Sequence, residues 1–148
     1  MAYWLMKSEP AVYPWSQLLA EGRTGWNGVR NYQANNNMKA MRIGDKAFFY
    51  HSGAGHAIVG IVKIISRWHP DPSDETGRFG MVDVAPVRAL LEPVPLAVLK
   101  ADLRLRGMVL LRQSRLSVAP VTAAEWKTIL SLQGKTTANG RRRRVLRP

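Results

Sequence analysis

The chain contains no cysteine, which excludes disulfide bonds, thiolate metal sites and cysteine nucleophiles. No apolar run approaches the roughly 18 residues that a membrane-spanning helix needs. The first seven residues, MAYWLMK, are apolar only briefly and lack the basic segment that opens a secretory signal peptide. We therefore expect a soluble, cytoplasmic protein with no membrane partner, and association with the nucleoid is a further option.

Acidic residues are also scarce. The 148 residues include ten aspartates and glutamates and 22 lysines and arginines, so the chain carries a net charge of +12. Half of that excess lies in residues 134–148, which hold six cations and no acid. We expect residues 1–133 to form one domain and residues 134–148 to be a basic, disordered tail. An excess of this size favours a polyanionic partner, and nucleic acid is the commonest one.

Signatures of catalysis or metal binding are missing as well. Gly134-Lys135-Thr136 resembles the end of a P-loop, but Ile129 stands where the motif needs its first glycine. Three histidines occur without cysteine partners or zinc-type spacing. No serine lies in a nucleophile-elbow sequence. We expect no catalytic residue, no metal and no cofactor.

Short apolar segments, separated by turn residues, make up the rest of the chain. Strands are predicted at residues 2–7, 46–51, 57–65, 79–87, 108–111 and 116–119, and helices at residues 31–41, 95–99 and 123–132. A further short helix is predicted with Pro14 in its first turn, running through Trp15, Leu18 and Leu19 and stopping at Gly22. The last helix has the clearest start, because Thr122 and Glu125 form a capping box. The helices cluster instead of alternating with strands, which indicates an α+β fold with a curled, mixed β-barrel of five to six strands and short helices at its rim and ends.

The segment from Gly25 to Asn36 is the most informative stretch. It combines one indole, two glycines, an arginine and several amides, a mixture that a hydrophobic core has little use for because each buried amide needs partners. Trp4, Trp15 and Trp126 fit core positions, whereas Trp26 lies between glycines in a polar loop. A partly exposed indole held on a rigid turn suits base stacking.

The blocks Tyr3–Pro10, Trp26–Ala34, Phe48–Ser52, Ile58–Ile61, Met81–Val84 and Met108–Arg112 resemble those of the EVE domain family, in the same order. The resemblance spans residues 3 to about 132. It implies a PUA-like β-barrel that binds a modified base, with methylated or hydroxymethylated cytosine in DNA as the expected target. By resemblance to the related YTH domains, Lys7, Ser8, Trp26 and the His51-Ser52-Gly53 turn would surround that base.

The expected site combines the residues assigned by resemblance with those chosen for their chemistry. The base-binding candidates are Trp26, Lys7, Ser8, Gly28, Val29, Asn31, His51 and Ser52, and the phosphate-binding candidates are Arg30, Gln33 and Arg112. Free amides at the start of the helix over residues 31–41 favour anions there. Asn31 also suits a helix cap, and Arg30 suits a solvated charge. Two positions depart from the family pattern: Asn35 stands where arginine is usual, and Pro14 replaces a serine cap.

Three other interpretations stay open from the sequence. A general RNA-binding PUA-like protein would bind every nucleic acid alike, an enzyme acting on a nucleobase would release product, and a protein-interaction module would bind no nucleic acid without its tail. If the chain binds DNA, the six tail cations should steepen the dependence of log affinity on log salt by about five and leave base preference unchanged. We expect a monomer.

Overall fold

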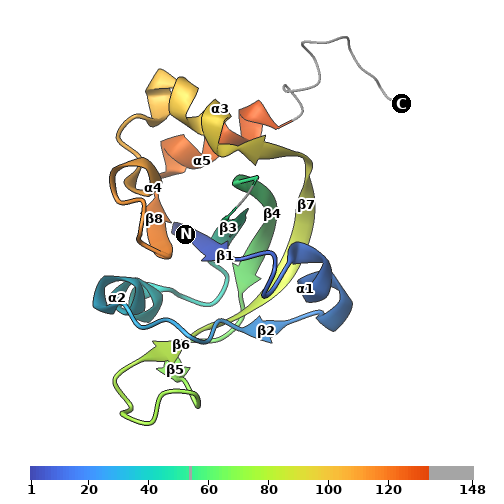
Figure 1. The fold of residues 1–148 in the computed structure, drawn as a ribbon. Coiled ribbons are helices and arrows are strands. Elements are labelled where there is room, and N and C mark those ends of the chain that lie inside the picture. The colour runs from blue at the N-terminus through green and yellow to red at the C-terminus, as the bar shows by residue number, and fades with distance from the viewer. Residues whose placement is uncertain (54, 134–148) are drawn as a thin grey trace.

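The computed structural model describes residues 1–53 and 55–133. A six-stranded sheet in the order β2-β7-β4-β3-β1-β8 curls into a half-barrel, with a two-stranded sheet, β5-β6, at one end (Figure 1). The strands are β1 (Tyr3–Ser8), β2 (Thr24–Gly25), β3 (Lys46–His51), β4 (Ala57–Ile64), β5 (His69–Pro70), β6 (Gly80–Met81), β7 (Asp83–Pro95) and β8 (Val118–Val121). The expected α+β barrel-like fold is confirmed.

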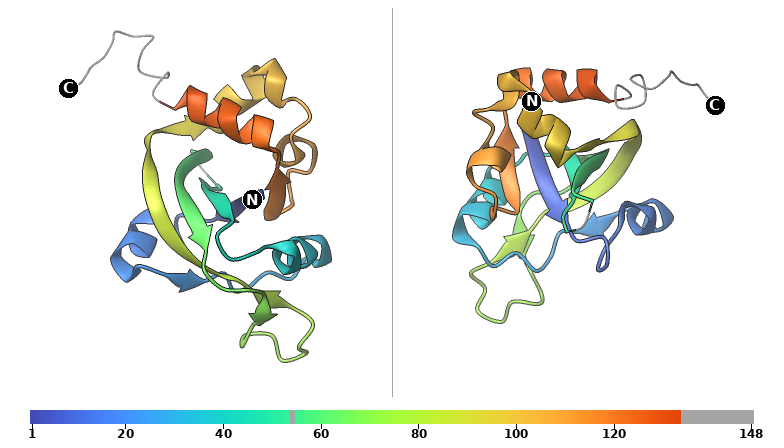
Figure 2. Two further views of the ribbon diagram at one scale, coloured as in Figure 1. Left: turned by 180° about the vertical axis from the view of Figure 1, so that it is seen from behind. Right: turned by 45° about the horizontal axis from the view of Figure 1, so that its top comes forward.

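Short helices close the half-barrel. They are α1 (Trp15–Glu21), α2 (Tyr32–Ala40), α3 (Leu96–Ala101), the 3₁₀ turn η1 (Leu103–Leu105), α4 (Val109–Arg112) and α5 (Ala123–Leu132). Helices α3 and α5 lie together across one end of the sheet, and α1 and α2 lie toward the other (Figures 1 and 2). The capping box at Thr122 and Glu125 is confirmed, since each side chain bonds the other residue's backbone amide. No helix in the described residues is long and apolar enough to cross a membrane.

The central strands divide the core into two layers. Successive side chains of a strand point to opposite faces, so Phe49 of β3 joins Trp15, Trp26 and α2 on one face. Phe48 and Tyr50 join Trp126 and α5 on the other face. Trp4, Trp15 and Trp126 are buried, as predicted.

Strand β1 lies inside the sheet and pairs with β3 in parallel and with β8 in antiparallel orientation. Lys7 is level with Tyr50, and Ser8 is level with His51. The carboxyl ends of β1 and β3 therefore lie side by side at one end of the sheet. The side chains of consecutive residues there point to opposite faces of the sheet.

Three of the strand predictions need correction. The apolar run Met108–Leu111 is not a strand, because its backbone closes helical bonds from Arg112 and Gln113 back to Met108 and Val109 to make α4. Periodicity cannot separate a helix from a strand over four residues. The strand expected at 116–119 begins two residues later as β8.

The strand expected at 79–87 is two strands, β6 and β7, and β7 continues to Pro95. Its prolines are accommodated because the pairing with β4 shifts register twice along its length. The predicted tight turn at 52–55 includes Ala54, and the predicted disordered tail spans 134–148. Both Ala54 and the tail lie outside the described residues.

Candidate nucleobase site

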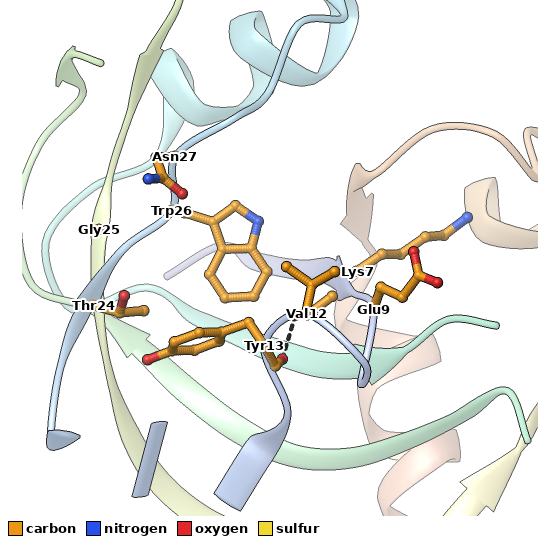
Figure 3. Close-up of a pocket in the computed structure, with 9 residues that line it drawn as sticks. Lys7, Glu9, Val12, Tyr13, Thr24, Gly25, Trp26 and Asn27 are labelled. Atoms are coloured by element: carbon orange, nitrogen blue, oxygen red, sulfur yellow. Dashed lines mark hydrogen bonds between the residues drawn. The ribbon is translucent and has the colours of Figure 1, made fainter. Parts of the chain in front are cut away.

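A cavity of about 380 Å³ opens beside the carboxyl end of β1, and we call it the indole cavity. Its walls come from the end of β1, the turn into α1, and strand β2 with the two residues that follow it (Figure 3). The lining residues are Lys7, Ser8, Glu9, Val12, Tyr13, Thr24, Gly25, Trp26 and Asn27. This volume lies within the range of small-molecule sites, and the lining mixes aromatic, amide and hydroxyl groups as such sites do.

The indole of Trp26 lies in the middle of this lining, between Asn27 and the Val12–Tyr13 turn (Figure 3). Its backbone amide donates to the carbonyl of Val82, which fixes Trp26 to the residue between β6 and β7. The ring meets Phe49 edge to face, with centroids 5.5 Å apart. Only 8% of the residue is exposed and it belongs to the hydrophobic core, so the expectation of a partly exposed indole is wrong. The indole nevertheless adjoins a cavity.

Polar groups are available around the indole. The side-chain amide of Asn27 and the indole N–H of Trp26 have no hydrogen-bond partner among the described residues. An amide offers both a donor and an acceptor, and the indole offers a donor. Ser8, by contrast, donates its hydroxyl to the carbonyl of Tyr13 and so holds the turn that forms one wall.

Lys7 leaves the same strand end and lines both this cavity and another on the opposite side. Its ammonium donates to the carbonyl of Ser114 at 2.6 Å, which leaves two N–H groups for other partners. Burial lowers the pKa of Lys7. A cation of this kind, held at the junction of two cavities, suits contact with an anion.

The loop after Trp26 is fixed by one buried carboxylate. Asp71 accepts from the amide of Gly28 at 2.7 Å and from the guanidinium of Arg30 at 3.2 Å. Burial alone would raise the pKa of Asp71, but bonds from Ser73, Gly28 and Arg30 outweigh it and lower the pKa to about 2. Val29, between the two partners, is buried in the core. Gly28, Val29 and Arg30 thus build the loop that carries Trp26, and ligand contacts from them stay predictions.

Asn31 and Gln33 line a separate, polar cavity of about 290 Å³ with residues 113–116. The side chain of Asn31 accepts from the amide of Ala34 at 2.9 Å, so it caps α2 as the sequence suggested. The amide that adjoins Trp26 is therefore that of Asn27, and Asn31 lies in the lining of the neighbouring cavity.

The remaining candidates are dispersed. His51 accepts at Nε2 from the amide of Trp15 at 3.0 Å, and burial lowers its pKa, so the neutral ring anchors the start of α1. Ser52 lines the cavity opposite the indole. Arg112 is exposed and donates to the carbonyl of Gly107. The structure brings Lys7, Ser8 and Trp26 together in the indole cavity, and their roles stay predictions.

The side chain of Asn35 has a structural role. It is 1% exposed, and its carbonyl accepts from the indole of Trp68 at 2.8 Å and from the amide of Gly80 at 3.0 Å. Its own amide group donates to the carbonyl of Arg78. This side chain ties α2 to strand β6.

The residues that sequence reasoning missed come mainly from the turn after β1. Glu9, Val12 and Tyr13 complete the indole cavity with Thr24 and Asn27. Asn27 could have been chosen, because it follows Trp26 directly in a polar loop. Tyr13 carried no such signal, since only the fold brings it beside Trp26. Within the described residues, no cluster of histidine, aspartate and glutamate could hold a metal.

This curled mixed sheet, with a cavity at the carboxyl end of its first strand, belongs to the PUA-like class of half-barrels. Residues 2–132 match the EVE domain family, and the chain is a member of that family. Human thymocyte nuclear protein 1 is 36% identical over 90% of this chain and 75% of its own length.

Two solved structures show the same fold. The protein Rpa0253 from Rhodopseudomonas palustris is 48% identical, covers 97% of this chain and 100% of its own, and superposes with a TM-score of 0.86. Human THYN1 in complex with DNA containing 5-methylcytosine is 36% identical, covers 90% and 98%, and has a TM-score of 0.85.

Proposed function

We propose that this chain is a non-catalytic DNA-binding module that holds a modified cytosine in the indole cavity. The observation that carries the proposal is Trp26 itself, an indole that adjoins a cavity of about 380 Å³ beside an unpartnered amide. The human relative crystallised with 5-methylcytosine DNA supports the choice of ligand. We further propose that the module acts as a monomer in the cytoplasm.

The bound base would lie against the Trp26 ring within the indole cavity. The amide of Asn27 and the indole N–H would then serve the polar edge of the cytosine, which presents both donors and acceptors. Lys7 and Ser8, at the end of β1, would close the opposite side.

Magnitudes limit what this pocket achieves alone. Extruding a base from a duplex costs a few kcal/mol, and one aromatic stack returns about 1–3 kcal/mol. Phosphate contacts must therefore supply much of the affinity for a duplex, which suits a chain of net charge +12. Burying one methyl group adds only about 0.8 kcal/mol, or roughly fourfold. A larger preference needs a hydrogen bond to a hydroxymethyl group or a misfit with plain cytosine.

The test is a binding panel of DNA and RNA oligonucleotides, each carrying one cytosine, 5-methylcytosine or 5-hydroxymethylcytosine. We expect the wild-type protein to prefer a modified DNA strand by about fourfold or more. Trp26→Ala should remove that preference, and Trp26→Phe, which keeps a flat ring, should keep part of it. Urea unfolding of both variants identifies any loss that comes from misfolding.

Three outcomes would contradict the proposal. If the Trp26→Ala protein is folded and keeps its preference for modified cytosine, the indole does not bind the base. Equal affinity for all DNA and RNA strands would favour a general RNA-binding protein. New nucleosides found by mass spectrometry after incubation would show an enzyme.

A further inference from the structure

A second cavity of about 420 Å³ lies on the other face of the sheet from Trp26, and we call it the basic cavity. It begins at the same strand end, since Lys7 lines both cavities. Segments from β3, α3, α4 and the loop after α4 surround it. The lining residues are Lys7, Tyr50, Ser52, His56, Leu96, Lys100, Leu110, Leu111, Ser114 and Arg115.

The charge of this cavity is of one sign. Lys7, Lys100 and Arg115 line it, and among the residues that the structure describes no carboxylate does. The ion pairs formed within the described ranges use Arg23, Arg30, His69 and Arg104, so none of them neutralises the three cavity cations. Three cations that converge on one hollow without an acid favour an anionic occupant.

The hydroxyl of Tyr50 is a further polar group of this cavity. Tyr50 is only 2% exposed, yet its phenol hydroxyl has no hydrogen-bond partner in the described part of the chain. Burial raises the pKa of Tyr50, so the hydroxyl stays protonated at neutral pH and can donate. The hydroxyl is not among the polar atoms sealed inside the described part of the chain, so it can donate to an oxygen of an anion in the cavity. The Lys7 ammonium lies 5.9 Å from the centre of the same ring.

The register of the sheet relates this cavity to the indole cavity. β1 and β3 run parallel, with Lys7 beside Tyr50 and Ser8 beside His51. Because alternate residues point to opposite faces, Tyr50 belongs to the layer under α5, whereas Ser8 borders the layer that holds Trp26. The carboxyl end of β1 therefore borders both cavities, and a chain of nucleotides that passes over it can reach both.

We propose that the basic cavity binds a backbone phosphate of the same DNA strand whose modified base occupies the indole cavity. Lys7, Lys100 and Arg115 neutralise the phosphate, and the hydroxyl of Tyr50 donates to one of its oxygens. This inference rests on the proposed function and makes the ligand a strand segment instead of a free base or nucleoside. A free phosphate ion has the same chemistry, so the experiment separates the two sources.

The experiment measures binding of three probes: a single-stranded trinucleotide with a central 5-methylcytosine, the 5-methyldeoxycytidine nucleoside, and inorganic phosphate. The test variant is the double substitution Lys100→Gln/Arg115→Gln, whose two side chains are exposed at the cavity rim. The matched control is Lys63→Gln/Arg67→Gln, which removes two exposed cations that line neither cavity. Tyr50→Phe removes the hydroxyl alone and keeps the ring in the core.

We expect the test variant to bind the trinucleotide about tenfold more weakly than the control, as the loss of charge-assisted bonds to one phosphate predicts. Its slope of log affinity against log salt should fall by about 0.7, the value for one phosphate contact of a single strand. Tyr50→Phe should weaken the trinucleotide several-fold. The nucleoside should bind the test and control variants equally, and the preference for 5-methylcytosine over cytosine should not change.

Other results would overturn the inference. If test and control variants bind the trinucleotide alike while Trp26→Ala still removes the methyl preference, the basic cavity is not a phosphate site and the proposed function stands. If only inorganic phosphate binding depends on Lys100 and Arg115, the occupant is a free ion and the strand proposal is wrong. If no variant or probe shows a methyl preference, the proposed function and this inference fail together.

Discussion

Replacing Asp71 with asparagine should destabilise the protein in a way that depends on pH. The Asp71 side chain is fully buried and accepts from the amide of Gly28, from Arg30 and from Ser73. Asparagine keeps one carbonyl oxygen but turns an N–H₂ group toward donors. Hydrogen bonds to a charged group are worth about 1.5–3 kcal/mol, so we expect a loss of about 2–3 kcal/mol at pH 7.

The pH dependence follows from the direction of the pKa shift. Folding lowers the pKa of Asp71 from 3.8 to about 2. A group with a lowered pKa in the folded state stabilises the protein above its unfolded pKa and loses that effect as the pH falls toward its folded pKa. The shift corresponds to about 1–2 kcal/mol once solvent screening of the exposed Arg30 is allowed for. The wild-type advantage over Asp71→Asn should shrink by that amount between pH 5 and pH 2.

Urea unfolding followed by tryptophan fluorescence at several pH values from 7 to 2 measures this difference. Glu75→Gln is the matched control, because it removes one exposed carboxylate from the same loop. The reasoning is refuted if the gap between wild type and Asp71→Asn is constant across the range, or if Glu75→Gln reproduces its pH dependence.

Two further substitutions test the packing that supports the site. Gly60→Ala should destabilise the protein by about 1–3 kcal/mol in urea unfolding, because a methyl there would lie 2.5 Å from the ring of Trp15. Gly107→Ala, with open space around it, is the control, and equal stability of the two variants would contradict the expected clash. Asn35→Ala should cost about 2–4 kcal/mol, since it leaves the indole N–H of Trp68 and a buried amide without acceptors. A loss below about 0.5 kcal/mol would show that water replaces the lost carbonyl.

Local signals account for the parts of the fold that could be predicted. The capping box at Thr122 and the strand over residues 46–51 depend on neighbours in the sequence, and both are found. The short run that became α4 carries too few residues for its period to decide between helix and strand. The full length of β7 could not be predicted because it contains prolines. The register shifts along it depend on the pairing with β4.

The residues of the candidate site divide in the same way. Trp26, Lys7 and Ser8 could be chosen from the sequence, and they line one cavity. Tyr13 could not, because its place beside Trp26 depends on the turn after β1. Asp71 lies in a segment that composition marks only as a loop, and its role appears only when the chain brings it to a partner 43 residues away.

The position of β1 between β3 and β8 has a consequence for how the molecule forms during synthesis. Its two neighbours in the sheet are made long after it, and the second, β8, is separated from it by more than 100 residues. Contacts this distant in sequence close slowly. A nascent chain that has not yet emerged as far as Val118 leaves one side of β1 unpaired, so the sheet is completed only after almost the whole domain has been translated.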